Sequence, residues 1–204
     1  MTGILSPNKC EKKFSEKFCK NMTKKIGLVE KAARIMAVAH EKQTRKSDGS
    51  PFIVHPVMVA LKLVKLGFGD SVIAAALTHD VLEDTDFSEE KMREKLGEDV
   101  LKIVKTVTED KSLAWEDRKQ KYIETVRNGS EETKAVSISD KIHNLENLLD
   151  AHAQMGTNIW EKFNRGKEKK RWFEHAMLDM FRESWKHPLV DEYAELVAWM
   201  DKLQ

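Results

Sequence analysis

A histidine and three acidic residues follow directly after an apolar segment near the middle of the sequence. Residues 72–77 are rich in alanine and contain no glycine or proline, which predicts a buried helix. His79, Asp80, Glu83 and Asp84 come at the end of this helix. Because residues four apart lie on one helix face, we expect the imidazole and the carboxylates to gather at its end.

The chemistry of this cluster depends on what balances its charge. Carboxylates that are partly buried and close together resist ionisation unless something positive lies between them. A divalent metal ion meets that need, and imidazole with carboxylate is a ligand set for Mn²⁺, Fe²⁺, Co²⁺ or Zn²⁺. A histidine–aspartate dipeptide alone is more often a chance pair, and two adjacent residues cannot complete a metal site. Further ligands must come from elsewhere in the chain.

Two other segments offer those ligands. Asp140, Asn144 and Asn147 form a polar stripe at helical spacing between apolar residues. The stripe could be a solvated face, but a helix so apolar on its other sides should be central, where a carboxylate needs a partner. His55 precedes Pro56 at the start of an expected helix, and it is either a structural histidine or a second imidazole ligand. The combined hypothesis is a metal site with room for water, made of His55, His79, Asp80 and Asp140.

Composition limits the possible partners. The chain has 204 residues and a net charge of +1, with 35 basic and 34 acidic residues, so it has no global attraction to nucleic acid or to an anionic membrane. It contains neither a run long enough to cross a bilayer nor a secretion signal. Cys10 and Cys19 match no zinc or disulfide pattern and indicate free thiols in the cytoplasm.

The elements that must position these residues are all expected to be helices. Apolar periodicity and turn residues divide the chain clearly, and no strand pattern is present. The fold class is therefore all-α, a compact multi-helix bundle, with a basic arm at residues 1–22 and a single domain at 23–204. The expected helices are 24–45, 57–66, one that carries the 72–85 cluster, 88–96, 99–108, 114–127, 131–155, 162–185 and 189–203.

The sequence resembles the HD-domain hydrolases of the Rel/Spo alarmone family, especially the small stand-alone branch that includes the metazoan SpoT homologue. The likeness covers roughly residues 25–185. HDxxED alone would be weak, but its combination with an upstream RK…HP and a downstream DKxxN is highly specific. The segments that carry it are 39–46, 49–56, 75–85, 107–111 and 139–145.

The resemblance implies an HD-domain bundle of about ten helices, a Mn²⁺ ion and removal of the 3′-pyrophosphate of (p)ppGpp, a small-molecule nucleotide. It implies hydrolysis alone, because we expect no room for a synthetase domain. The loop after Lys46 varies in length in the family, and Lys141 stands where the long bifunctional enzymes have arginine. The implied roles are metal ligation by His55, His79, Asp80 and Asp140, handling of the attacking water by Glu83 and Asp84, base binding by Arg45 and Lys46, and nucleotide contact by Asn144, with Asn147, Lys111 and Lys141 as further substrate-binding candidates.

Two other classes of function remain open on the sequence. The first is a related HD phosphohydrolase that acts on another nucleotide, a cyclic dinucleotide or a reduced dinucleotide phosphate, with the same metal site and a different base pocket. The second is a non-enzymatic module that binds an alarmone and signals through a partner. Glu83 and Asp84 argue against the second class, because a binding module needs neither. A nucleic-acid binder is the weakest option, given the balanced charge.

Overall fold

The computed structural model describes residues 26–45 and 48–204, and the regular structure in these ranges is helical. The prediction of an all-α fold is confirmed, with an isolated antiparallel bridge between Thr44 and Pro51 as the β-type interaction found there. The expected basic arm at 1–22 and both cysteines lie outside these ranges. The elements are α2 (Leu28–Ala39), α3 (Val54–Lys65), α4 (Asp70–Thr78), α5 (Val81–Asp84), α6 (Glu89–Leu96), α7 (Glu98–Val107), α8 (Trp115–Arg127), α9 (Glu131–Met155), the 3₁₀ helix η1 (Gly156–Lys162), α10 (Gly166–Ser184) and α11 (Pro188–Asp201).

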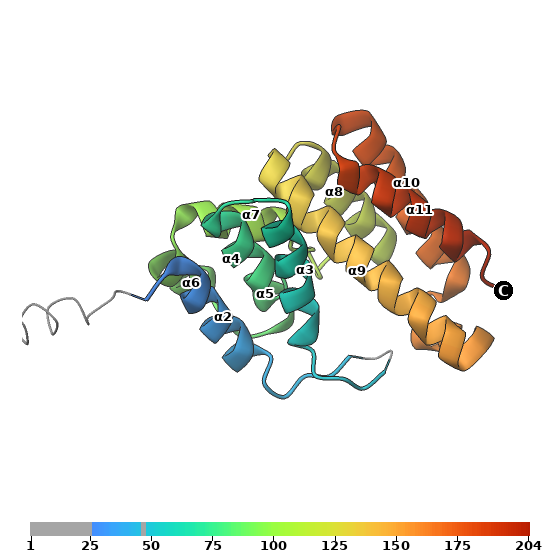
Figure 1. Ribbon diagram of the computed structural model, residues 1–204, viewed down its shortest axis with the longest axis horizontal. Helices are drawn as coiled ribbons and strands as arrows, with labels where there is room; N and C mark the ends of the chain where they lie inside the picture. The colour runs from blue at the N-terminus through green and yellow to red at the C-terminus, as the bar shows by residue number, and fades with distance from the viewer. Residues whose placement is uncertain (1–25, 46–47) are drawn as a thin grey trace, which may run out of the picture.

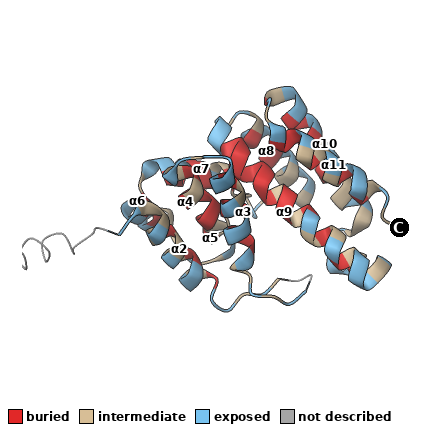
Figure 2. Ribbon diagram, in the orientation of Figure 1, coloured by how far each residue is buried: buried red, intermediate tan, exposed pale blue. Residues whose placement is uncertain are grey.

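Helix α9 is the central element of the molecule. It begins at the N-cap Ser130, whose hydroxyl accepts a hydrogen bond from the backbone N–H of Thr133 at 3.3 Å, and it ends at Gly156, whose φ is +60°. It contacts α3, α4 and α7 on one side and α8 and α11 on the other, and Figure 1 shows it running between these two groups of helices. Its N-terminal half is the most continuously buried part of the helix (Figure 2), with residues 133–140 all buried.

Small side chains allow helices to pack closely around α4. Ala74, Ala75 and Ala76 are fully buried, and α4 contacts both α2 and α3 extensively. Because alanine adds little volume, neighbouring backbones can approach α4 from several directions. This packing holds the C-terminal end of α4, where the acidic cluster begins, against α9. In the described part of the chain, no helix is both long and apolar enough to cross a membrane.

The helix expected to run continuously through the acidic cluster is divided into α4 and α5. His79 and Asp80 lie between them with helical backbone angles (φ/ψ of −60°/−35° and −90°/−6°), so the interruption is local. The Thr78 hydroxyl and His79 Nδ1 each bond a carbonyl oxygen of the preceding turn at 2.8 Å. Such side-chain bonds compete with the helix's own backbone bonds. The expectation of one continuous helix was therefore wrong.

Several other helix boundaries differ from the prediction: α10 begins at Gly166 instead of residue 162, and two further differences lie near the acidic cluster. Helix α2 ends at Ala39 instead of continuing to residue 45, because the following segment turns back and the backbone N–H of Phe52 bonds the carbonyl oxygen of Gln43 at 3.0 Å. Helix α3 begins at Val54 instead of residue 57, so that His55 and Pro56 lie in its first turn. Proline is tolerated there because the N–H it lacks has no partner within the helix.

Candidate metal centre and active site

Four side chains from three parts of the fold converge on one point. His55 comes from α3, His79 and Asp80 from the junction of α4 and α5, and Asp140 from the buried half of α9. His55 Nε2 lies 3.2 Å from His79 Nε2 and 3.0 Å from Asp140 Oδ1. Asp80 Oδ2 lies 3.2 Å from His79 Nε2 and 3.6 Å from His55 Nε2. Atoms bound to one ion at about 2.1 Å would be separated by roughly 3.0 to 3.4 Å. The ligand atoms of His55, His79 and Asp80 all lie within 4.8 Å of one another and could hold a single metal ion, and Asp140 Oδ1 lies beside the two imidazoles, 3.0 Å from His55 Nε2 and 3.7 Å from His79 Nε2.

Hydrogen bonds behind the two imidazoles turn the same ring nitrogen toward this point. His79 Nδ1 lies 2.8 Å from the carbonyl oxygen of Ala76 and donates to it, which leaves the lone pair of Nε2 facing the cluster. His55 Nδ1 lies 2.7 Å from Nδ1 of His143, a second buried histidine on α9. Metal-binding histidines commonly have their other ring nitrogen held in this way. Both rings are therefore oriented before any ion binds.

The electrostatics of the cluster favour a positive charge at its centre. Burial alone would lower the pKa of His79, but the carboxylates of Asp80 and Asp140 hold that pKa well above its usual range. Burial alone would raise the pKa of Asp140, yet the Lys141 ammonium and the two histidines hold it well below its usual range. The carboxylates thus stay ionised and bind a cation, which can be a proton on an imidazole or a divalent metal.

Glu83 and Asp84 lie on α5 beside the candidate ligands, and Glu109 and Lys111 hold them by hydrogen bonds. Glu83 Oε2 accepts a hydrogen bond from the backbone N–H of Glu109 at 3.0 Å. Burial raises the pKa of the Glu83 carboxyl, with the backbone hydrogen bond opposing that rise. Lys111 Nζ donates to the carbonyl oxygen of Glu83 at 2.7 Å and to Asp84 Oδ1 at 2.5 Å. Lys111, which was expected to contact phosphate, is thus paired with α5 in the structure.

Arg45 is connected to Asp140, one of the candidate metal ligands, through Asn144. Arg45 Nη2 donates to Asn144 Oδ1 at 3.0 Å, and Asn144 Nδ2 donates to Asp140 Oδ1 at 2.6 Å. The Arg45 guanidinium lies 5.9 Å from the centre of the Phe52 ring. Lys46, the other residue expected to bind the base, lies outside the described residues.

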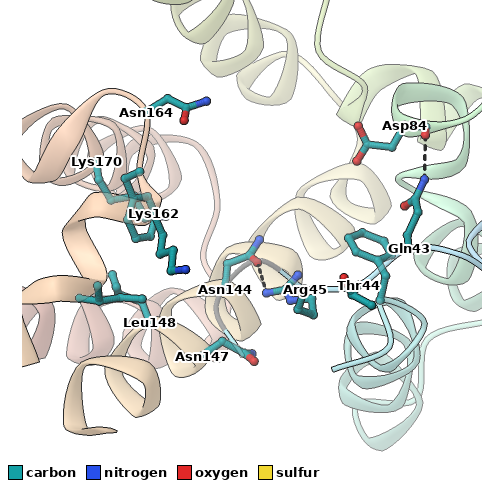
Figure 3. Close-up of a pocket in the computed structure, with 13 residues that line it drawn as sticks. Gln43, Thr44, Arg45, Asp84, Asn144, Asn147, Leu148, Lys162, Asn164 and Lys170 are labelled. Carbon is teal, nitrogen blue, oxygen red and sulfur yellow. Dashed lines mark hydrogen bonds between the residues drawn. The ribbon is translucent and has the colours of Figure 1, made fainter. Parts of the chain in front are cut away.

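Three cavities meet at this site. A small one of about 170 Å³ is lined by the four candidate ligands together with Glu83 and Asp84. A second, of about 650 Å³, is lined by Arg45, Phe52 and Asn147, and a third, of about 690 Å³, is lined by Lys141. Asn144 borders all three. Figure 3 shows Asn144 and Asn147 between Arg45 and Gln43 on one side and the lysines of the last helices on the other. Open space therefore lies on both sides of Asn144.

The ammonium group of Lys141, which lines the third cavity, is held by an ion pair and by two aromatic rings. Its ammonium group is 2.8 Å from Asp140 Oδ2 and lies over the rings of Tyr122 and Phe173, at 5.0 and 5.4 Å from their centres. Burial alone would lower the pKa of Lys141, but Asp140 raises it well above its usual range. Lys141 therefore remains charged and neutralises one ligand carboxylate.

Sequence reasoning missed three supporting residues. His143 supports His55, and its position three residues after Asp140 on the same helix was an available signal. Glu109 supports Glu83, and Gln43 Nε2 donates to the carbonyl oxygen of Asp84 at 3.0 Å while its Oε1 lies 2.9 Å from Nδ1 of His40. The contact between Glu83 and Glu109 joins residues 26 positions apart, and the contact between Gln43 and Asp84 joins residues 41 positions apart. No local sequence pattern could reveal either of them.

Comparisons with known proteins agree with this geometry. The HD domain model of protein families matches residues 32–167. A Xenopus tropicalis protein named guanosine-3′,5′-bis(diphosphate) 3′-pyrophosphohydrolase MESH1 is 37% identical over 130 residues, covering 62% of this chain and 73% of that protein. An Aquifex aeolicus protein with the same enzyme name is 35% identical over 123 residues, which cover 59% of this chain and 18% of that longer protein.

A solved structure is also similar over most of the chain. It is that of a metazoan SpoT orthologue described as hydrolysing ppGpp. The two match with a TM-score of 0.71 and 26% identity, over 87% of this chain and 97% of the other. Because the family match extends over more than half of the sequence and includes all four candidate ligands, the chain belongs to the HD-domain family, in which it is related to the metazoan ppGpp hydrolases.

Proposed function

We propose that this chain is a metal-dependent hydrolase that removes the 3′-pyrophosphate of (p)ppGpp. The observation that carries the proposal is the convergence of two imidazoles and two carboxylates beside Glu83. The two Nε2 atoms lie 3.2 Å apart, and each lies 3.0 to 3.7 Å from an oxygen of Asp80 and of Asp140. The names of the similar proteins supply the substrate class. A binding module would have no use for a buried carboxylate next to a metal centre.

His55, His79, Asp80 and Asp140 would hold the divalent ion. The donor set is compatible with Mn²⁺, Fe²⁺, Co²⁺ or Zn²⁺, and we take the ion to be Mn²⁺ because the resemblance to the Rel/Spo hydrolases implies it. When bound, such an ion lowers the pKa of water and neutralises charge that develops on phosphate. The chain's own contribution is a fixed donor set. Each imidazole has its second nitrogen engaged, and the Asp140 carboxylate is held by Asn144 and Lys141.

Glu83 is the proposed general base. It takes a proton from water as the water oxygen bonds to the phosphorus attached to the ribose 3′-oxygen. The bond between that phosphorus and the 3′-oxygen breaks, pyrophosphate leaves with the water oxygen, and the 3′-oxygen takes up a proton from solvent to become a hydroxyl. Its raised pKa suits this role, because a stronger base accepts a proton more readily near neutral pH. Asp84, which Lys111 holds in place, orients the water or the substrate.

Arg45 is the proposed contact for the purine. A guanidinium is planar and charged, so it can stack on a base, and here it lines the cavity next to the centre together with Phe52. Asn144 fixes the guanidinium through a 3.0 Å hydrogen bond. Lys46 and Asn147 are the other proposed contacts of the nucleotide in this cavity.

A substrate panel tests the proposal. Initial rates with Mn²⁺ would be compared for ppGpp, pppGpp, a reduced dinucleotide phosphate, a cyclic dinucleotide and ordinary nucleoside triphosphates, and then repeated with Mg²⁺, Co²⁺ and Zn²⁺. We expect the highest kcat/KM for the two alarmones with Mn²⁺. Turnover of another nucleotide without turnover of ppGpp would retain the metal chemistry and reject the substrate.

A further inference from the structure

A buried carboxylate in the C-terminal helices holds a lysine at the edge of the active site. Glu174 of α10 has no exposed surface. Its Oε1 pairs with the ammonium group of Lys170, one turn earlier on the same helix, at 2.5 Å. Its Oε2 accepts a short hydrogen bond from the hydroxyl of Tyr193 on α11, which is also fully buried. These two contacts connect the buried Tyr193, through Glu174, to Lys170.

Stability alone does not account for this arrangement. Burying a carboxylate costs free energy, and replacing a buried ion pair with apolar residues is often neutral or stabilising. Burial raises the pKa of Tyr193 well above its usual range, so the hydroxyl keeps its proton and remains a donor to Glu174. Both carboxylate oxygens are thus occupied, and the position of the Lys170 ammonium is fixed.

Lys170 lies where the two larger cavities adjoin. It lines both of them, as do Phe163 and Asn164, and Asn144 borders both beside the metal centre. Figure 3 shows Lys170 and Asn164 across the cavity from Arg45. A nucleotide bound with its base near Arg45 and one phosphate group at the metal centre would therefore have Lys170 on its opposite side.

The cavity of about 690 Å³, which Lys141 lines, has an excess of positive charge. Its lining includes the cations Arg118, Lys119, Lys141, Arg165 and Lys170. The carboxylates paired with these cations are Glu109, which pairs with Arg118 and Lys119, Asp140, which pairs with Lys141, and Glu174, which pairs with Lys170. Five cations facing three carboxylates suit a polyanionic ligand, and phosphate accepts such charge-assisted hydrogen bonds.

We propose that Lys170 is a substrate-binding residue that contacts the phosphate group remote from the cleaved bond, and that Glu174 and Tyr193 are its positioning residues. For (p)ppGpp, whose identity as the substrate rests on the proposed function, the remote group is the 5′-polyphosphate. Lys170 then contributes to selecting nucleotides that are phosphorylated at both ends.

The first test measures binding without chemistry. GDP carries a base and a 5′-diphosphate but has no 3′-phosphate, so its affinity for the metal-free chain reports on the base site and the remote phosphate site without the metal centre. Calorimetry should show that Lys170→Met weakens GDP binding about ten- to a hundred-fold, the range for a charge-assisted hydrogen bond. The matched control is Lys169→Met, since Lys169 pairs with Glu116 at 3.1 Å and lines neither of the two larger cavities. This control should bind GDP like the parent chain.

Further variants separate positioning from folding. Tyr193→Phe removes one donor to Glu174 and should weaken GDP binding by a smaller factor, while Lys170→Arg should restore most of the affinity. If Lys170→Met fails to fold because Glu174 is left unpaired, the double variant Lys170→Met with Glu174→Gln removes both charges and is measured instead. GDP binding at parental strength in a folded Lys170 variant, or no GDP binding by the parent at millimolar concentration, would overturn the inference.

Kinetics distinguish this inference from the proposed function. If the parent hydrolyses ppGpp, Lys170→Met should raise KM for ppGpp with little change in kcat, and it should leave KM unchanged for guanosine 3′-diphosphate, which lacks 5′-phosphates. An equal rise for both substrates would overturn the role of Lys170 and leave the proposed function intact. If the parent hydrolyses neither substrate, the proposed function fails, and GDP binding still decides the role of Lys170.

Discussion

Asp140 organises the site at the scale of single residues. Its Oδ1 lies 3.0 Å from His55 Nε2 and accepts a hydrogen bond from Asn144 at 2.6 Å, while its Oδ2 is paired with Lys141 at 2.8 Å. One oxygen is therefore available to a metal ion and the other is neutralised. The same carboxylate connects the metal centre, through Asn144, to the guanidinium of Arg45.

Replacing Glu83 with glutamine should keep the fold and the bound metal while lowering kcat by about 10² to 10⁴, the usual contribution of a general base. Burial raises the pKa of Glu83 above its ordinary value of 4.5, and the base acts only when ionised. Parental kcat/KM should therefore fall as pH drops through this raised pKa, and the residual activity of Glu83→Gln should lack that acid limb. Rates across pH and elemental analysis provide the test, and loss of metal together with activity would make Glu83 a ligand instead.

Replacing Arg45 with alanine should raise KM for ppGpp roughly ten- to a hundred-fold and change kcat little. Stacking contributes about 1 to 3 kcal/mol per base, and it is present equally in the ground and transition states. Arg34→Ala is a suitable control, because Arg34 is exposed on α2 and pairs with Glu30 at 2.7 Å. Steady-state kinetics measure KM for both variants. Equal KM values for Arg45→Ala and Arg34→Ala would show that Arg45 does not contact the base.

At the scale of helices, sequence patterns located most elements and missed the details that shape the site. The predicted 131–155 helix matches α9, because Ser130 and Gly156 mark its ends clearly. The break after Thr78 was missed; at this point the His79 imidazole bonds the carbonyl oxygen of Ala76, three residues earlier. A helical period does not contain that information.

The start of α9 also depends on a close approach between helices. A Cβ at Gly129 would lie 2.9 Å from Cγ2 of Thr133 on α9 and 3.2 Å from Cγ2 of Thr106 on α7. Gly129→Ala should therefore destabilise the protein by roughly 1 to 3 kcal/mol, as overpacking usually does. Adding Thr133→Ser removes the nearer methyl group and should recover part of the loss. Urea denaturation measures both variants, and parental stability for Gly129→Ala would contradict this packing.

At the scale of the whole molecule, the site exists only when distant helices are assembled. Its ligands come from α3, from the α4–α5 junction and from α9, with cavities extending toward α10. The convergence of the candidate ligands could be predicted from the sequence because their types and motifs are distinctive. Lys170 and Glu174 could not, because their importance appears only when α10 lies beside the cavities.

Removing the metal should lower the stability of the whole fold, because an ion that binds only the folded state stabilises it. The effect is about 2.7 kcal/mol at a free metal concentration one hundred times Kd. A chelator should therefore lower the Tm of the parent chain. Asp140→Ala should contain no metal by elemental analysis and show no chelator-dependent change in Tm. Full metal content in Asp140→Ala would reject the ligand set.

The most direct test of the account is the identity of the products formed from ppGpp. The Mn²⁺-loaded chain would be incubated with ppGpp, and the nucleotide and phosphate products separated by anion-exchange chromatography. Hydrolysis at the 3′ side predicts GDP and pyrophosphate in equal amounts, with no orthophosphate, and none of these products with Asp140→Ala. Release of orthophosphate, cleavage at the 5′ side, or no reaction while another nucleotide is hydrolysed would contradict the account.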